Sequence, residues 1–171
     1  EDKPAKSKKG LYRIKDEFFA FWFRFVFPRR GDLEMGRLQR VAGEIRNGLP
    51  QHLSLVYERV AAEMLWKHMD RFFPFDALGR WWDRGEEVDL VAPNREEGRM
   101  LFAEVKWSEK LVGTDIYEGL KKKAAVVNLG EGEAEVAEKR FALFSKKGFT
   151  PAMLRTAREE GVALFKADRP F

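Results

Sequence analysis

The sequence predicts an α/β fold whose core elements follow in the order α-β-β-β-α-β around a mixed central sheet. Two features favour this order. Three short apolar segments, over 78–82, 87–92 and 99–107, are separated by turn residues, as expected for consecutive strands. Amphipathic helical patterns precede and follow these strands, so helices can cover both faces of the sheet. An aromatic-rich helical segment precedes this core.

The elements on either side of the three strands have their own signals. Before the strands, the pattern predicts one helix over 33–47 that Gly48 stops, and a second helix over 51–69. After them, we expect a helix over 113–129, an acidic loop at 130–135, a strand over 140–145, a helix over 151–160 that Thr150 caps, and a strand over 162–165.

Composition excludes several classes of function. A length of 171 residues suits one domain, or one domain with a short appended segment, and 44% hydrophobic residues suffice for a packed core. The absence of cysteine excludes disulfides, thiolate nucleophiles and cysteine-type zinc sites, and it favours the cytoplasm. No apolar run is long enough to predict a membrane span. The sequence also lacks a Walker-type phosphate loop, which argues against ATP hydrolysis by this chain alone.

A helix expected over 17–27 is unusually aromatic. Asp16 is placed to cap its start, and Pro28 is expected to end it. Because aromatic side chains cover almost every face, we expect burial against the helix's own domain or against a partner domain. The aromatic residues are Phe18, Phe19, Phe21, Trp22, Phe23, Phe25 and Phe27.

Two basic clusters are candidates for contact with phosphate. Lys6, Lys8 and Lys9 lie in the turn-rich segment 1–12, which is either a solvated tail or a hairpin tip that contacts a nucleic-acid backbone. The lysine run at 121–123 lies on an expected helix, where it is either a solvated face or a phosphate contact. The net charge of +4 permits nucleic-acid binding but does not require it.

Two acidic residues and a lysine lie inside the apolar strand segments. Asp89 precedes Glu104 by 15 positions (104 − 89), and a hairpin through 93–98 would bring the two carboxylates together. Residues that share a strand face are about 7 Å apart along the chain, so Glu104 and Lys106 are expected to be neighbours. Period-2 alternation puts Leu101, Ala103, Val105 and Trp107 on one face of this strand and Phe102, Glu104 and Lys106 on the other.

These groups have the chemistry of a magnesium site that activates water. Carboxylate oxygens are the usual protein ligands of Mg²⁺ or Mn²⁺, so Asp89 and Glu104 are the expected primary ligands, with the carbonyl of Val105 beside them. Lys106 would orient or deprotonate a water and balance negative charge in the transition state. Such a site suits the hydrolysis of a phosphodiester, since a bound divalent ion neutralises charge on the phosphate.

A third carboxylate is expected from the helix that precedes the strands. Glu58 is the better candidate, because it follows a tyrosine at the start of an apolar stretch, and Glu63 is the second. The alternative to a metal site is an ion pair of Lys106 with Glu104 or with Asp89 on a solvated strand face. The residues alone leave both interpretations open.

The arrangement of these residues resembles a known enzyme superfamily. The set Glu58, Asp89, Glu104 and Lys106 is similar to the motif of the PD-(D/E)XK nucleases, with Val88 where the family's name has proline. The resemblance implies a restriction-endonuclease-like fold and a Mg²⁺- or Mn²⁺-dependent endonuclease that hydrolyses phosphodiester bonds in DNA. It also implies that these four residues are catalytic and that the three acids bind the metal.

A narrower resemblance is to the uncharacterised C-terminal domain of archaeal DEXX-box ATPases. In that family an ATPase domain and a winged helix precede this region. The resemblance implies that residues 1–50 are a basic, wing-like segment with helices that link to an upstream domain, and that residues 51–171 are the nuclease-like domain. The chain departs from the family at Ser54 and Tyr57, where glycine and phenylalanine are frequent. The segments that carry the likeness are 10–16, 21–25, 79–82, 87–89, 104–107 and 143–146.

Three functions are consistent with the sequence. The first is an active DNA nuclease, and the second is a catalytically silent module of the same fold that binds nucleic acid or regulates an ATPase. The third is self-association through the aromatic helix over 17–27, which would give a homodimer. In each case we expect a cytoplasmic protein with nucleic acid as a partner and no membrane attachment.

Overall fold

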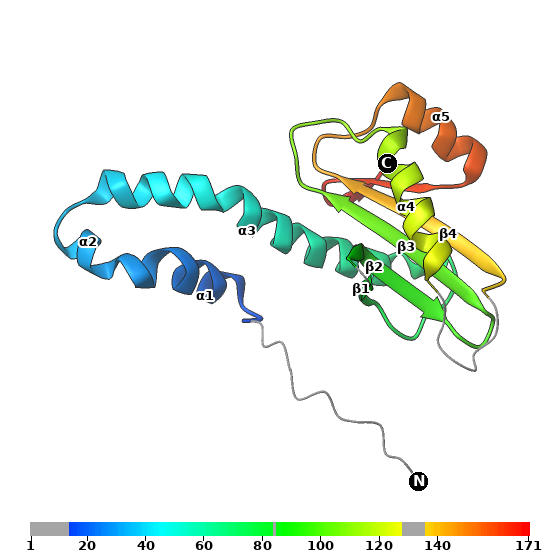
Figure 1. Ribbon diagram of the computed structural model, residues 1–171, viewed down its shortest axis with the longest axis horizontal. Helices are drawn as coiled ribbons and strands as arrows, with labels where there is room; N and C mark the ends of the chain where they lie inside the picture. The colour runs from blue at the N-terminus through cyan, green and yellow to red at the C-terminus, as the bar shows by residue number, and fades with distance from the viewer. Residues whose placement is uncertain (1–13, 84, 128–135) are drawn as a thin grey trace, which may run out of the picture. The chain divides into compact units, whose positions relative to one another are not determined.

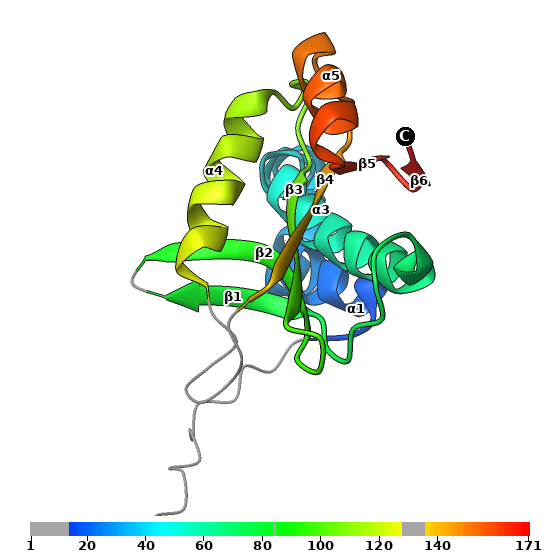
Figure 2. The ribbon, with the colours of Figure 1, turned by 90° about the vertical axis from the view of Figure 1, so that its right-hand side faces the viewer.

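The computed structural model describes residues 14–83, 85–127 and 136–171 (Figures 1 and 2). The chain divides into two compact units, Glu1–His52 and Leu53–Phe171. The basic residues Lys6, Lys8 and Lys9 and the acidic loop at 130–135 lie outside the described residues. Within the described part of the chain, no helix combines the length and the apolar character needed to cross a membrane.

The first unit begins with a helical path that changes type along its length. Phe19 donates its backbone N–H to Asp16 Oδ1 at 3.0 Å, which confirms the expected cap. Pro28 does not end the path, so that prediction is wrong. It lies in the first turn of a short 3₁₀ helix, where its missing N–H removes little. The successive elements are α1 (Glu17–Phe21), the π-helix η1 (Trp22–Val26), the 3₁₀ helix η2 (Phe27–Arg29) and α2 (Arg30–Glu34).

Most of the aromatic side chains on this path are exposed within the chain. Among the described residues, Phe25 is the aromatic residue of this segment that is buried, at 3% exposure. Five of the seven are exposed, which contradicts the expectation of burial within their own domain: Phe18, Phe19, Trp22, Phe23 and Phe27. Burial against a partner domain stays a prediction.

A single long helix, α3 (Leu38–Lys67), replaces the two helices expected over 33–47 and 51–69. Gly48 therefore does not stop a helix. A Cβ at this position would lie 2.6 Å from Cε1 of Phe25, so glycine here lets the buried ring approach the helix closely. Gly36, with φ of +73°, lies in the turn that follows α2.

The second unit is a mixed sheet with helices on both faces (Figure 2). The strands lie in the sheet in sequence order, with β3–β4 and β4–β5 parallel and the other neighbours antiparallel. Helices α4 and α5 pack on one face through one hydrophobic cluster, and the C-terminal part of α3 packs on the other through a second cluster. The strands are β1 (Gly79–Asp83), β2 (Glu86–Asn94), β3 (Arg99–Lys106), β4 (Glu138–Ser145), β5 (Ala163–Lys166) and β6 (Arg169–Pro170), and the helices are η3 (Met69–Arg71), α4 (Thr114–Val126) and α5 (Pro151–Glu160).

This order confirms the predicted α/β class and the α-β-β-β-α-β succession. Leu101, Ala103 and Val105 pack in the cluster beneath α3, whereas Phe102 packs in the cluster beneath α4, so the predicted alternation along β3 is confirmed. Thr150 accepts a hydrogen bond from Met153 N, as the predicted cap of α5 requires. The short β6 was not predicted.

Gly48→Ala should destabilise the chain although alanine is the better helix former. The new methyl group would displace the Phe25 ring, and overpacking of this kind costs about 1–3 kcal/mol. Gly43→Ala in the same helix is the matched control. A Cβ at position 43 meets nothing within 4 Å, so alanine there should stabilise by up to about 1 kcal/mol. Denaturant melts followed by far-UV circular dichroism measure both changes. Equal shifts in the two variants would contradict the packing role of Gly48.

Candidate functional site

Asp89 lies where the pairing of β2 with β3 ends. The last paired residues at this end of the hairpin are Leu90 and Ala103. One residue further along β2, Asp89 Oδ2 accepts a hydrogen bond at 2.8 Å from the backbone N–H of Val105. The N–H and C=O of one strand residue point toward the same neighbouring strand, so the Val105 carbonyl faces this edge as well. A carboxylate and a carbonyl oxygen therefore lie together at the end of the hairpin.

Glu104 lies on the face of β3 that α4 covers, and it is 6% exposed. Lys106 donates a hydrogen bond from Nζ to Glu104 Oε1 at 2.7 Å, which forms the ion pair that the strand pattern allowed. From α4, Lys123 Nζ lies 3.3 Å from Glu104 Oε2 and 3.4 Å from Oε1. A buried carboxylate without partners costs several kcal/mol, so these two ammonium groups are what make the burial of Glu104 tolerable.

The electrostatics of the site are dominated by burial and by the proximity of the two acids. Burial and the negative charge of Glu104 raise the pKa of Asp89 from 3.8 to about 6, against the opposing effects of the Val105 N–H and of Lys106. Burial by itself would lower the pKa of Lys106, but the hydrogen bond and charge of Glu104 outweigh it and the pKa is raised. Lys106 is therefore an ammonium group at neutral pH.

Glu58 approaches the same site from α3. Its carboxylate forms an ion pair with Arg80 of β1, and Arg80 also contacts Glu87 Oε1 at 2.7 Å. The charge of Glu58 contributes to raising the pKa of both Asp89 and Lys106, which places Glu58 within electrostatic reach of the pair. By contrast Glu63, the second candidate, is exposed on α3.

The oxygen atoms at this edge fit a magnesium ion better than a metal bound by protein groups alone. Within the described ranges, no three or more histidine, aspartate or glutamate side chains gather closely enough to hold a metal ion. Mg²⁺ usually keeps several water ligands and takes one or two carboxylates plus substrate oxygens. The carboxylates of Asp89 and Glu104, with the Val105 carbonyl at the same edge, match that smaller set.

The sequence did not assign two cationic residues, Arg80 and Lys123, to the acidic site. Arg80 is brought to Glu58 by the pairing of β1 with β2, whose register shifts between Gly79 and Trp81, and no local pattern indicates such a shift. Lys123 belongs to the lysine run at 121–123, but the pattern of the helix alone did not single out one lysine. The available signal was the helical spacing of the buried residues Leu120 and Ala124, which marks the side of α4 that packs on the sheet.

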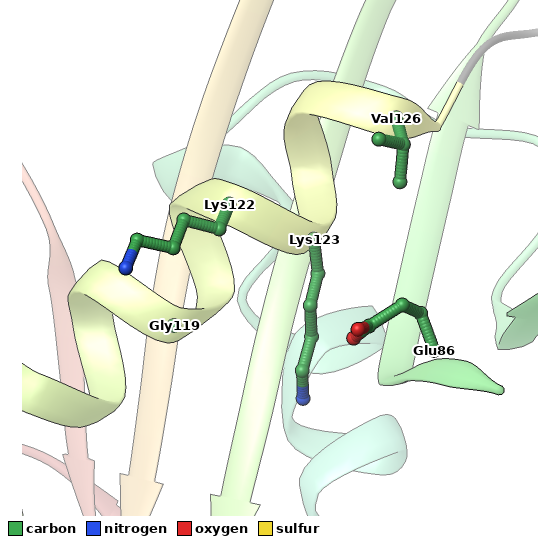
Figure 3. Close-up of a pocket in the computed structure, with 5 residues that line it drawn as sticks. All are labelled: Glu86, Gly119, Lys122, Lys123 and Val126. Carbon is green, nitrogen blue, oxygen red and sulfur yellow. The ribbon is translucent and has the colours of Figure 1, made fainter.

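A pocket of about 280 Å³ adjoins Lys123 on the side of α4 (Figure 3). In Figure 3 the carboxylate of Glu86, at the start of β2, is directed toward the Lys123 side chain, whereas Lys122 extends away from both. The lining residues are Glu86, Gly119, Lys122, Lys123 and Val126. The pocket thus shares one residue, Lys123, with the acidic site.

Comparison with known proteins assigns the chain to a family. It belongs to the family DUF234, described as archaea bacterial proteins of unknown function, which matches residues 22–125, more than half of the chain. An uncharacterized protein of Methanocaldococcus jannaschii is 42% identical over 149 residues, which are 84% of this chain and 32% of that protein. The chain therefore spans about a third of the length of this curated relative.

A distant likeness to a solved structure was also found. The crystal structure of a repair endonuclease from Pyrococcus abyssi matches 66% of this chain and 47% of that chain, with a TM-score of 0.40 and 16% identity. A likeness of this size does not bear on the site.

Asp89→Asn should stabilise the protein at neutral pH in metal-free buffer. The pKa of Asp89 is raised from 3.8 to about 6 in the folded state. The folded state therefore binds the proton more tightly than the unfolded state, and its stability falls as the pH rises through this interval. Asparagine keeps an acceptor for Val105 N–H without the charge. A shift from 3.8 to about 6 corresponds to a gain of about 3 kcal/mol at neutral pH, which disappears below about pH 4.

Denaturant melts with EDTA at neutral and acidic pH measure this gain. The matched control is Asp76→Asn, since Asp76 is an exposed aspartate outside the site. A stability change that is the same at both pH values, or a loss of stability at neutral pH, would contradict the assigned environment of Asp89.

Proposed function

We propose that this member of the family is a metal-dependent nuclease domain that hydrolyses phosphodiester bonds in DNA. The observation that supports it is the convergence of Asp89 and Glu104 where β2 and β3 part, with the Lys106 ammonium hydrogen-bonded to Glu104. A buried glutamate with a half-buried aspartate and lysine beside it is expensive to maintain for stability alone, and perturbed groups of this kind concentrate at functional sites.

Under this proposal Asp89 and Glu104 hold Mg²⁺ or Mn²⁺, with the Val105 carbonyl at the same edge and Glu58 as the further carboxylate. When bound, such an ion lowers the pKa of a coordinated water and neutralises charge on the phosphate. The protein's own contribution is to hold the acids and the lysine in fixed positions. Asp89 is oriented by the Val105 N–H, and Glu104 by Lys106 and Lys123.

Lys106 is proposed to orient water and to balance charge, since its raised pKa opposes the role of a base. In the reaction, the water oxygen forms a bond to phosphorus while the bond from phosphorus to the 3′ oxygen breaks. The water gives up a proton to solvent, and the leaving 3′ oxygen takes one up. The products are a 5′-phosphate and a 3′-hydroxyl, and the Lys106 ammonium offsets the negative charge that develops between these two states.

The wider context of the domain is also a proposal. The resemblance to the C-terminal domain of archaeal DEXX-box ATPases supports a cytoplasmic protein in which an ATPase domain and a winged helix precede residues 1–50, and residues 51–171 form the nuclease-like domain. In that context Lys6, Lys8 and Lys9 would contact the DNA backbone. Self-association through the aromatic face of α1 and η1 is a further proposal, supported by the exposure of these side chains.

A second candidate function is a silent module that binds DNA or regulates an ATPase. One observation favours it: Glu104 is paired with two lysines and Glu58 with Arg80, so these acids are compensated by the chain's own cations. Among the described residues, three carboxylates are not gathered around one point. A network of this kind is stable as a purely structural element and would preserve the fold while cleavage is absent.

Glu104→Gln should reduce Mg²⁺-dependent nicking of plasmid DNA by about a hundredfold or more, because the amide cannot replace a carboxylate ligand. Lys106→Met should reduce it by a similar factor through loss of the ammonium group. The readout is the rate at which supercoiled plasmid is converted to the open form, with Mg²⁺ and with Mn²⁺.

Glu159→Gln is the matched control, since Glu159 is an exposed glutamate on α5, and it should leave the rate unchanged. Circular dichroism of each variant tests whether the fold is retained. Equal nicking by wild type, Glu104→Gln and Lys106→Met would indicate a contaminating nuclease. DNA binding by the wild type without nicking in either metal would favour the silent module.

A further inference from the structure

Two ammonium groups meet one carboxylate at the centre of the site, and they do so unequally. Lys106 lies on the same strand as Glu104 and contacts it at 2.7 Å, whereas Lys123 reaches across from α4 and lies at 3.3 Å and 3.4 Å from the two oxygens. Together these lysines supply two positive charges to a buried acid, which is the charge that a divalent cation would bring. The contact of Lys123 is the longer and comes from a separate element.

The Lys123 ammonium group also has an alternative position beside α4. It lines the pocket of about 280 Å³ beside α4, and the carboxylate of Glu86 is directed toward it from the start of β2 (Figure 3). Glu86 is exposed, so an ammonium group that moves toward it enters solvent rather than an apolar interior. The release of Lys123 from Glu104 therefore leaves no buried unpaired charge on the lysine.

We propose that Lys123 is a resident counter-cation of Glu104, which a divalent cation displaces when it binds Asp89 and Glu104. The inference rests on the proposed metal-dependent function and adds a residue to it. Lys123 acts through Glu104 as a positioning residue: it neutralises and orients the carboxylate until a metal ion takes its place. Lys106 keeps its shorter contact from the same strand and stays beside Glu104 in both states.

Competition of this kind has two measurable consequences. First, the metal must replace a charge-assisted contact, so removal of the Lys123 ammonium should tighten metal binding on the order of tenfold. Second, without metal the buried Glu104 would keep only one ammonium partner, so the same change should lower the melting temperature. A saturating concentration of metal should restore the melting temperature, because the ion supplies the missing positive charge.

The test is calorimetric titration of the purified chain with Mn²⁺ in the absence of DNA. Lys123→Met keeps the aliphatic stem and removes the charge, so it should bind Mn²⁺ about tenfold more tightly than wild type. Lys123→Arg retains a cation and should stay near the wild type. Lys122→Met is the matched control: it removes the same charge from the neighbouring exposed residue and should change the affinity less than about twofold.

Two further measurements locate the effect at the site. In a Glu104→Gln background, Lys123→Met should no longer tighten Mn²⁺ binding, because the carboxylate for which the lysine and the metal compete is then absent. The melting temperature with EDTA should fall in Lys123→Met and rise more on addition of Mn²⁺ than it does in the wild type. Should Lys123→Met unfold at the assay temperature, Lys123→Gln provides the same loss of charge with a polar side chain.

The outcomes separate this inference from the proposed function. If the wild type binds Mn²⁺ and nicks DNA while Lys123→Met and Lys122→Met titrate alike, Lys123 does not compete with the metal and the proposed function stands. Weaker binding by Lys123→Met also overturns the inference. If neither the wild type nor any lysine variant binds Mn²⁺ or nicks DNA, both ideas fail together.

Discussion

The hydrogen bond from the Val105 N–H to the Asp89 carboxylate is the contact on which the candidate site depends. It lies one residue beyond the last backbone pair of the β2–β3 hairpin. If the strands parted without it, the Val105 N–H would be a buried donor without a partner, and such groups are rarely left unpaired in folded proteins. The acid thus satisfies the Val105 N–H where the pairing of β2 with β3 ends, while β3 itself continues to Lys106.

The second constraint on the site is the balance of charge between its carboxylates and the neighbouring cationic side chains. Three carboxylates meet three cationic side chains, drawn from α3, the first three strands and α4: Glu58, Asp89 and Glu104 with Arg80, Lys106 and Lys123. The balance is uneven, because Asp89 has the raised pKa and accepts a backbone N–H instead of a direct ion pair. Charged groups that are buried within an otherwise regular sheet reduce stability, and such groups are typical of sites that are maintained for function.

The sequence predicts the parts of this arrangement that depend on local periodicity. The three strands, the alternation along β3 and the proximity of Glu104 and Lys106 all follow from neighbours along one chain segment. The parts that failed depend on distant packing. Gly48 lies inside a continuous helix, and Phe25, more than twenty positions earlier, packs where its side chain would be. Similarly, Arg80 and Lys123 join the site only through strand register and through the docking of α4, which no single segment specifies.

The nuclease and the silent module would share one fold. They differ in whether Glu104 is bound more favourably by the lysines of the chain or by a metal ion. A buried ion-pair network need not stabilise a fold more than apolar residues of the same size would, so its presence alone does not favour a structural role. The unequal contacts of Glu104 bear on this balance. A purely structural pair would gain most from two short contacts, yet the contact from α4 is longer than the contact within β3. The contact from α4 is therefore the one that a cation would replace under the proposed displacement of Lys123, whereas the contact within β3 would be kept.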